Sequence, residues 1–351
     1  MDPNQALTDG TPPQASAFAL VLSGGLALGA FQAGVLAALA GRGRWPSRIV
    51  GSSTGALNAA VALGGPVETA PERLWQLWFG SADLFAGAGA GFGGGPWSMA
   101  DAGARFLSAA ETLGLGRAGL FRPRPVPLSL LQPAAGHMSL APLQARLLDL
   151  VDFDRLNAGP VSACITATDL ETGEAVVLDT ATGPLGPADV AASCAMPPLF
   201  APVERQGRLL GDGGLTANTP VAQVLGSGLP AIVVDLLPRP GERPASLSEG
   251  ASRAAAIAFA TQTWTVIDAA REAHGLRERL ARAGEGDPPA AVHLAIVPYV
   301  VPGEEPGVAR LLDYRADVLS RRWVAGESAA MRALERLESR PSETFRVEVC
   351  P

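Results

Sequence analysis

A serine enclosed by glycines is the part of the sequence with the clearest chemical meaning. The pentapeptide at 51–55, GSSTG, follows a predicted short buried strand at 47–50 and overlaps a predicted helix at 54–62. A strand, a sharp turn and a helix in this order form a nucleophile elbow, in which glycines allow an approach that side chains would prevent. The sequence therefore predicts that Ser53 Oγ is presented to a substrate carbonyl as the nucleophile of an acyl transfer.

A second glycine-rich turn, GGLALG at 24–29, comes directly after a predicted strand and opens a predicted helix. Backbone N–H groups at such a helix start form a ready anion site. The glycine spacing is not that of the dinucleotide-binding fingerprint, and no acidic residue follows at the distance which that fingerprint requires. We therefore expect the N–H groups of Gly24, Gly25 and Leu26 to stabilise an oxyanion rather than to bind a nucleotide.

The third turn, Asp212-Gly213-Gly214, places a carboxylate after the predicted strand 208–210. A serine hydroxyl is too weak an acid to attack unaided, so a neighbouring base must accept its proton as the new bond forms. A carboxylate can do this where partial burial raises its basicity, and the two glycines let its backbone come close. Alone, such an aspartate is an ordinary turn residue.

Together these turns resemble the motifs of the patatin-like phospholipase family. The matching blocks follow the order of that family and lie at residues 23–36, 51–59, 168–173, 192–203 and 212–221. Several ordered matches are far more specific than any one of them.

The resemblance implies a lipid acyl hydrolase, an esterase or a phospholipase of the A type, that works through an acyl-enzyme intermediate. Its Ser–Asp dyad would consist of Ser53 as the nucleophile and Asp212 as the base, with no metal and no cofactor. A lipid or another acyl ester is the implied substrate. The glycines that support these motifs are Gly29, Gly51, Gly55, Gly213 and Gly214.

The sequence departs from the family pattern at two positions. Leu26 stands where a third glycine is usual, and its N–H can donate only if the local backbone has a negative φ. Leu28 stands where a basic residue is usual, which removes a partner for a phosphate headgroup or for a structural ion pair. We therefore expect neutral acyl esters to be hydrolysed better than anionic phospholipids.

Two other functions are compatible with the sequence. A Ser–His–Asp α/β-hydrolase needs a histidine after the serine and the acid, and His274 and His293 satisfy this order. However, His293 lies inside the predicted strand 292–297 and His274 lies within a predicted helix, so structural roles fit both better. His137 is predicted to be a solvated loop residue. The second alternative is a non-catalytic lipid-binding or scaffold protein on the same fold, and the presence of both dyad residues argues against it.

Strand-like and helix-like stretches alternate along the chain. Such alternation predicts an α/β fold with a mostly parallel central sheet and helices on both faces, and the resemblance implies the same three-layer α/β/α architecture. The predicted parts are a disordered N-terminal tail (1–15), a catalytic core (16–236) with a Gly/Pro-rich insertion or lid at about 80–137, and a C-terminal helical extension (237–351). Later helices are predicted at 220–225, 252–282 and 308–337.

The uncharged apolar stretch 18–39 has the hydropathy of a membrane span or signal anchor. Glycines and the polar residues Ser23 and Gln32 interrupt it. They favour a buried strand at 18–23, a turn, and a buried helix at 29–40.

Composition and charge exclude other classes of function. The chain of 351 residues has a net charge of −7, and its 27 basic residues, all arginines, are scattered, so no nucleic-acid surface is predicted. Cys164, Cys194 and Cys350 are too widely spaced for a disulfide framework or a zinc site, which indicates a reducing compartment. Because the N-terminus lacks the basic region of a signal peptide, we expect a cytoplasmic protein. A lipid substrate implies, in addition, transient contact with a membrane surface. The sequence predicts no oligomeric state.

Overall fold

The structure is a computed structural model that describes residues 17–80, 99–124, 136–338 and 343–350, so the predicted tail lies outside the described residues. The strands are β1 (Ala19–Leu22), β2 (Arg48–Ser52), β3 (Arg122–Pro123), β4 (Met138–Ser139), β5 (Ser162–Asp169), β6 (Ala175–Asp179), β7 (Val203–Arg205), β8 (Arg208–Asp212), β9 (Ala231–Asp235), β10 (Val292–Pro298) and β11 (Phe345–Val349). The helices are α1 (Gly29–Gly41), α2 (Thr54–Leu63), α3 (Ala70–Phe79), α4 (Met99–Leu115), α6 (Ala141–Leu150), α7 (Phe153–Ala158), α8 (Pro187–Ser193), α9 (Gly214–Ala217), α10 (Leu247–Arg282) and α11 (Ala316–Glu338). Short helical turns are η1 (Leu26–Leu28), η2 (Val67–Thr69), η3 (Val221–Gln223) and η4 (Val308–Leu312).

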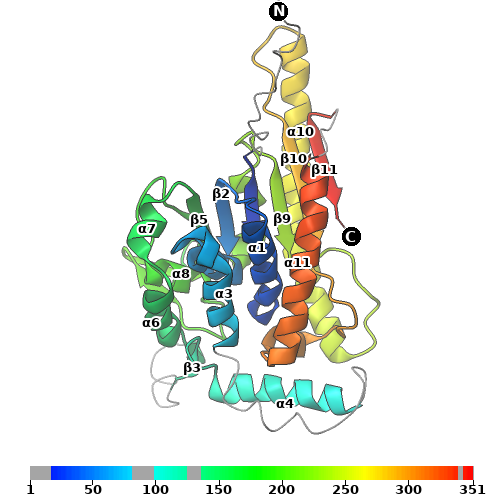
Figure 1. Cartoon of the computed structure of the whole chain (residues 1–351). Coiled ribbons are helices and arrows are strands. Elements are labelled where there is room, and N and C mark those ends of the chain that lie inside the picture. The colour runs from blue at the N-terminus through cyan, green and yellow to red at the C-terminus, as the bar shows by residue number, and fades with distance from the viewer. Residues whose placement is uncertain (1–16, 81–98, 125–135, 339–342, 351) are drawn as a thin grey trace, which may run out of the picture.

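A sheet of nine described strands forms the centre of the molecule, in the order β11-β10-β9-β1-β2-β5-β8-β7, with β6 paired to β5. The strands from β11 to β5 are parallel to their neighbours, whereas β6, β7 and β8 form an antiparallel edge. Figure 1 shows α1, α3 and α11 in front of this sheet and α10 behind it. The predicted three-layer architecture is therefore confirmed, and the sheet continues across the predicted boundary at residue 236.

The side chains of β1 show why both faces of the sheet must be covered. Leu20 and Leu22 belong to the larger core cluster, together with residues of α1, α2 and α11. Ala19 and Val21 belong to the smaller cluster, which includes Ile267 of α10. Because successive side chains of a strand point to opposite faces, a strand that is apolar at every position needs helices on both sides.

Helices α1 and α11 are so close that glycine is required on both. A Cβ atom at Gly34 would lie 2.0 Å from the Trp323 carbonyl oxygen. A Cβ atom at Gly326 would lie 2.0 Å from the Phe31 carbonyl oxygen. Backbone therefore packs on backbone, and α11 is held against the helix that follows the first glycine-rich turn.

The predicted helix 220–225 is wrong. The structure has α9 before this segment and only the short turn η3 within it. Pro220 precedes the turn with a ψ of 57°, outside the helical region, and no side chain caps the turn, so Thr219 does not have the capping role expected of it.

The predicted helix 308–337 is two elements, η4 and α11. The chain leaves the helical region at Asp313, which has a φ of −89° and a ψ of 99°. The Asp313 carboxylate accepts a hydrogen bond from Arg315 N–H at 3.2 Å. An aspartate that binds the backbone two residues later competes with helix formation, which explains the break.

The predicted insertion at 80–137 contains a regular helix, α4, and the two-stranded ribbon of β3 and β4. Residues 81–98 and 125–135 lie outside the described residues. The helix was missed because Gly103 and Gly114 weaken its helical pattern.

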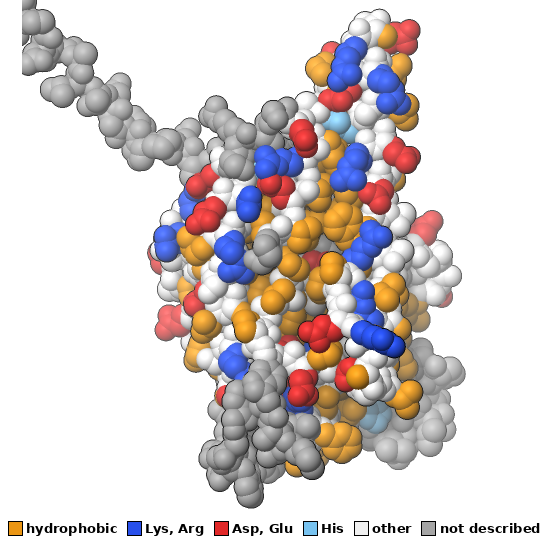
Figure 2. All heavy atoms as spheres, turned by 90° about the vertical axis from the view of Figure 1, so that its right-hand side faces the viewer, with side chains coloured by type: hydrophobic (Ala, Val, Ile, Leu, Met, Phe, Trp, Pro, Cys, Tyr) orange, Lys and Arg blue, Asp and Glu red, His pale blue; other side chains and the backbone are white. Residues whose placement is uncertain are grey.

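The apolar stretch 18–39 forms β1, a turn and most of α1, as predicted. Within the described ranges, no helix has both the length and the apolar character that crossing a bilayer needs. Figure 2 shows acidic and basic side chains interspersed over the face that lies on the right of Figure 1. Interspersed charges of this kind give that face no strong field of one sign.

Candidate active site

The strand register brings the glycine-rich turns close together at the carboxyl ends of the parallel strands. Leu22 of β1 pairs with Gly51 of β2, so these parallel strands end at the same level. Gly51 also pairs with Ile165 of β5, and Ala167 of β5 pairs with Asp212, the last residue of β8. Open α/β sheets place their ligands at the carboxyl ends of parallel strands.

Ser53 lies between β2 and α2 in a strained backbone conformation, with a φ of 53° and a ψ of −123°. A Cβ atom at Gly51 would lie 2.5 Å from the Gly55 carbonyl oxygen. A Cβ atom at Gly55 would lie 2.2 Å from the Leu22 carbonyl oxygen. The two glycines thus permit the close approach predicted for them, and they leave Ser53 at the head of a helix.

Asp212 lies beside this serine. Ser53 Oγ donates a hydrogen bond to Asp212 Oδ2 at 2.6 Å, and Gly214 N–H donates to Asp212 Oδ1 at 2.7 Å. Burial raises the pKa of the Asp212 carboxyl to about 7, and the two hydrogen bonds partly oppose this rise. A carboxylate with a pKa near neutrality can take and return a proton at physiological pH.

Ser193 connects the two turns. Ser53 N–H donates to Ser193 Oγ at 2.9 Å, and Ser193 Oγ donates to the Thr166 carbonyl oxygen at 2.6 Å. Ser193 is fully buried with its hydroxyl engaged, so it supports the site rather than competing with Ser53 as a nucleophile. Its place within the block 192–203 was the only sequence signal for it.

The glycine-rich turn after β1 offers two free N–H groups rather than three. Gly24 N–H donates to the Asn218 carbonyl oxygen at 3.0 Å, so Gly24 is not available as an oxyanion donor. Within the described part of the chain, the N–H groups of Gly25 and Leu26 have no hydrogen-bond partner. The negative φ that we set as the condition for a free Leu26 N–H is not found, because this residue has a φ of 50°; its N–H is nevertheless free to donate, so the condition was too strict. Leu26 therefore keeps a backbone conformation that favours glycine.

Buried polar side chains hold this turn against α2 and α3. Gln32 Nε2 donates to the Ser23 carbonyl oxygen at 2.8 Å. Asn58 Nδ2 donates to the Gly29 carbonyl oxygen at 2.9 Å, and Trp78 Nε1 donates to Asn58 Oδ1 at 2.9 Å. The sequence signal for this network was a single amide within each of two apolar helices, since a buried amide needs partners.

An apolar cavity of about 40 Å³ lies beside Ser53. None of the described residues that line it is charged. The bulky ones include Leu57, Trp78, Phe121, Phe200 and Tyr314.

The histidines are elsewhere. His274 Nε2 lies 3.1 Å from Thr344 Oγ1, and His293 Nε2 lies 3.3 Å from Glu348. Neither contacts Ser53 or lines its cavity. His137 is exposed. Among the described residues, no cluster of His, Cys, Asp or Glu is arranged to hold a metal ion.

Comparison with known families decides the relationship of this chain. A family model described as "Patatin-like phospholipase" matches residues 20–225, more than half of the sequence. The chain belongs to the patatin-like phospholipase family. This patatin-like protein is thus a lipid hydrolase of the esterase or phospholipase type, and lipids are its substrate class.

Among solved structures, the patatin-like chain is similar to VipD from Legionella pneumophila, with 16% sequence identity, a coverage of 91% of this chain and 67% of that chain, and a TM-score of 0.43. No curated protein sequence matches this chain at a significant level. Family membership therefore rests on the family model.

Proposed function

We propose that this protein hydrolyses carboxylic ester bonds of acyl lipids with Ser53 as the nucleophile and Asp212 as its base. The observation that carries the proposal is the 2.6 Å hydrogen bond from Ser53 Oγ to the buried Asp212 Oδ2. The strained backbone of Ser53 and the raised pKa of Asp212 support it, because strain and shifted pKa values cluster at functional sites.

In the first half-reaction, Ser53 Oγ attacks the ester carbonyl carbon while its proton passes to Asp212 Oδ2. The carbonyl oxygen becomes an oxyanion, and the N–H groups of Gly25 and Leu26 are the donors that stabilise it. The positive end of the α2 dipole, at Thr54, adds to this stabilisation. When the tetrahedral intermediate collapses, the ester C–O bond breaks and the leaving alcohol takes the proton from Asp212.

The second half-reaction reverses these proton transfers. Water attacks the acyl carbon and passes a proton to Asp212 Oδ2, which again forms an oxyanion in the same place. The bond between Ser53 Oγ and the acyl carbon then breaks, Ser53 recovers the proton, and the carboxylic acid leaves. One carboxylate suffices for both halves because it gives its proton to the leaving alcohol before the water attacks, and is then ionised again and ready to accept the next proton.

We also propose that neutral acyl esters are better substrates than anionic phospholipids. Leu28 is fully buried in the core, so position 28 offers no cation to an anionic headgroup. The stronger support is the cavity itself, which has no charged residue among its described lining. A higher kcat/KM for an anionic phospholipid than for a neutral ester with the same acyl chain would contradict this preference.

The transient membrane contact is assigned to α4 in this proposal. This helix exposes the apolar side chains Phe106, Leu107 and Leu115 and buries Ser108 and Thr112. A surface helix ordinarily shows the reverse pattern, and exposed apolar side chains of this kind suit the interface of a lipid layer.

The position of α4 links this apolar face to the site. Thr112 Oγ1 donates to the Leu312 carbonyl oxygen at 3.0 Å, close in sequence to Tyr314 in the cavity wall. In a Phe106→Ser/Leu107→Ser variant, co-sedimentation with phosphatidylcholine vesicles should fall several-fold, while hydrolysis of a water-soluble ester should stay at the wild-type rate. Unchanged co-sedimentation would remove α4 from the proposal. The cytoplasmic location stays a prediction, consistent with three free and buried cysteines.

A serine-reactive fluorophosphonate probe and an acyl-chain series of chromogenic esters test the dyad. Ser53→Ala should abolish labelling and hydrolysis, and Asp212→Asn should lower kcat by about 10²–10⁴-fold. His274→Gln and His293→Gln are the controls and should keep wild-type activity; a large loss in either would favour a Ser–His–Asp triad. Absence of labelling and hydrolysis in the wild type would favour a lipid-binding scaffold.

A further inference from the structure

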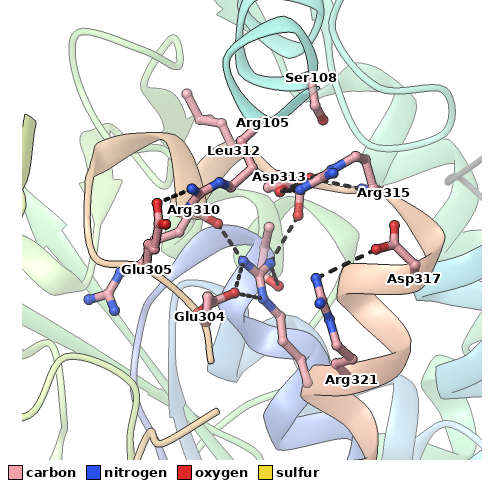
Figure 3. A network of polar contacts seen from close by, with 12 residues as sticks. Arg105, Ser108, Glu304, Glu305, Arg310, Leu312, Asp313, Arg315, Asp317 and Arg321 are labelled. Atoms are coloured by element: carbon pink, nitrogen blue, oxygen red, sulfur yellow. Dashed lines mark hydrogen bonds and ion pairs between the residues drawn. The ribbon is translucent and has the colours of Figure 1, made fainter. Parts of the chain in front are cut away.

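Arg322 of α11 is a fully buried arginine whose contacts reach the candidate oxyanion turn. Its Nη1 donates to the Ala27 carbonyl oxygen at 3.0 Å and to the Asp313 carbonyl oxygen at 2.9 Å. Its Nη2 donates to the Arg310 carbonyl oxygen at 2.8 Å, and both Nε and Nη2 donate to Glu304, at 2.9 and 2.7 Å. Figure 3 shows three of these partner residues, Glu304, Arg310 and Asp313, gathered in one polar network.

The Ala27 contact is the one with a bearing on the site. Ala27 directly follows Leu26, whose positive φ is unfavourable for a residue with a side chain. Strained conformations persist only where the surroundings hold them in place. A charge-assisted hydrogen bond from a buried guanidinium to the next carbonyl group provides such a hold.

Arg322 also brings a positive charge to a turn, residues 24–29, that has no charged residue of its own. In the family pattern a basic residue stands at position 28, and in this chain Leu28 occupies that position, fully buried in the core. The positive charge next to this turn comes instead from α11, beyond the region that the family model matches. The backbone contacts at Gly34 and Gly326 fix α11 against α1, so the guanidinium is held at a set distance from the turn.

We propose that Arg322 is a positioning residue for the oxyanion donors, because it holds the turn so that the N–H groups of Gly25 and Leu26 face the Ser53 site. Through the Asp313 carbonyl group it also fixes the neighbouring Tyr314, a wall of the cavity. This inference rests on the proposed function, since the oxyanion exists only if Ser53 attacks an ester.

The test compares ground-state and transition-state recognition in Arg322→Met and Arg322→Lys. Removal of one oxyanion donor costs about 10²–10³-fold in kcat. Because Arg322→Met displaces donors without deleting them, we expect a loss of about 10–100-fold in kcat with KM within about twofold. Affinity for an alkyl trifluoromethyl ketone, which forms a tetrahedral adduct with serine, should fall in parallel with kcat. Arg322→Lys keeps a charge beside Glu304 and should recover part of both.

Arg48→Met is the matched control. Arg48 pairs with Asp179 and donates to Ser162 Oγ at 3.1 Å, at the amino end of β2 and away from the turn. Its loss should lower stability but leave kcat and inhibitor affinity within about twofold. If Arg322→Met does not fold, Arg322→Lys decides the question.

Three outcomes are informative. Parallel losses of kcat and inhibitor affinity at constant KM support the positioning role. A folded Arg322 variant that loses only stability, as the Arg48 control should, would overturn it. A wild-type protein that neither hydrolyses esters nor reacts with the fluorophosphonate would overturn the proposed function first, and the positioning role with it.

Discussion

The region that the family model matches and the region after it contribute to the site in different ways. Residues 20–225 contain Ser53, Asp212 and the two free N–H groups, which are the groups proposed to touch the reacting atoms. The later region contributes Arg322 and Gln262, whose side chains bind the backbone of the turns. The proposed chemistry thus lies in the first region, and much of its support lies in the second.

Gln262 of α10 shows this support at the aspartate turn. Its Oε1 accepts a hydrogen bond from Asn218 N–H at 3.1 Å. Its Nε2 donates to the carbonyl oxygens of Gly214 and Leu215, at 3.3 and 3.2 Å. The comparison teaches that motifs specify which groups react, while distant helices fix how those groups are aimed.

The largest expected effect is the fall of kcat/KM at acidic pH, which tests two buried aspartates, one from each region. Burial raises the pKa of Asp212 to about 7 and that of Asp235 to about 6. Because the base must be ionised, kcat/KM should fall about tenfold per pH unit below 7 in the wild type. Asp235→Asn should leave this acid limb in place; if that substitution moves the limb, the later region takes part in the proton transfer.

The same shift in pKa predicts the opposite trend in stability. A folded-state pKa above the unfolded value of 3.8 gives a stabilisation that is complete below about pH 4 and is lost as the pH rises through 7. Denaturant unfolding of the wild type should therefore show a falling free energy of unfolding between pH 4 and 8, and Asp212→Asn should flatten that fall. A variant with an unchanged slope would show that Asp212 does not titrate in this range.

An intermediate effect concerns the acyl chain. The bulky apolar walls of the cavity predict that short acyl chains are preferred over long ones. Phe121→Ala should raise the ratio of kcat/KM for octanoate over butyrate by about tenfold, because it removes a wall. Leu148→Ala, at an exposed position of α6, is the control. Tyr314→Ala sharpens the comparison, because among the described lining residues Tyr314 is the one that the later region supplies. If neither Phe121→Ala nor Tyr314→Ala changes the ratio of octanoate to butyrate hydrolysis, the cavity is excluded as the acyl site.

The smallest effect is expected at Gln262. Gln262→Ala frees the carbonyl groups of the aspartate turn without touching Asp212, so kcat should fall by about three- to tenfold. Thr261→Ala, at the adjacent exposed position of α10, should change little. Equal rates in the two variants would mean that the later region supports only the oxyanion turn and not the aspartate turn.

The parts that could be predicted from the sequence are those specified by neighbouring residues. The strand before Ser53, the glycines around it and the turn after Asp212 each lie within a few residues. By contrast, Gly24 is engaged by Asn218 and Ala27 is bound by Arg322, 295 positions later. No local pattern predicts such contacts, because a polar residue in a helix has the same sequence context whether it is buried or solvated.

The glycine pair between α1 and α11 determines how this protein can be recombined with its relatives. A Cβ atom at Gly34 or at Gly326 would lie only 2.0 Å from a carbonyl oxygen of the other helix. The two glycines must therefore be inherited together. A chimera that takes residues 20–225 from this chain and a foreign C-terminal region would bring a side chain into that contact unless the donor also has glycine there. Such a graft should misplace α1 and the turn at its start, so exchangeable modules in this protein must include both helices.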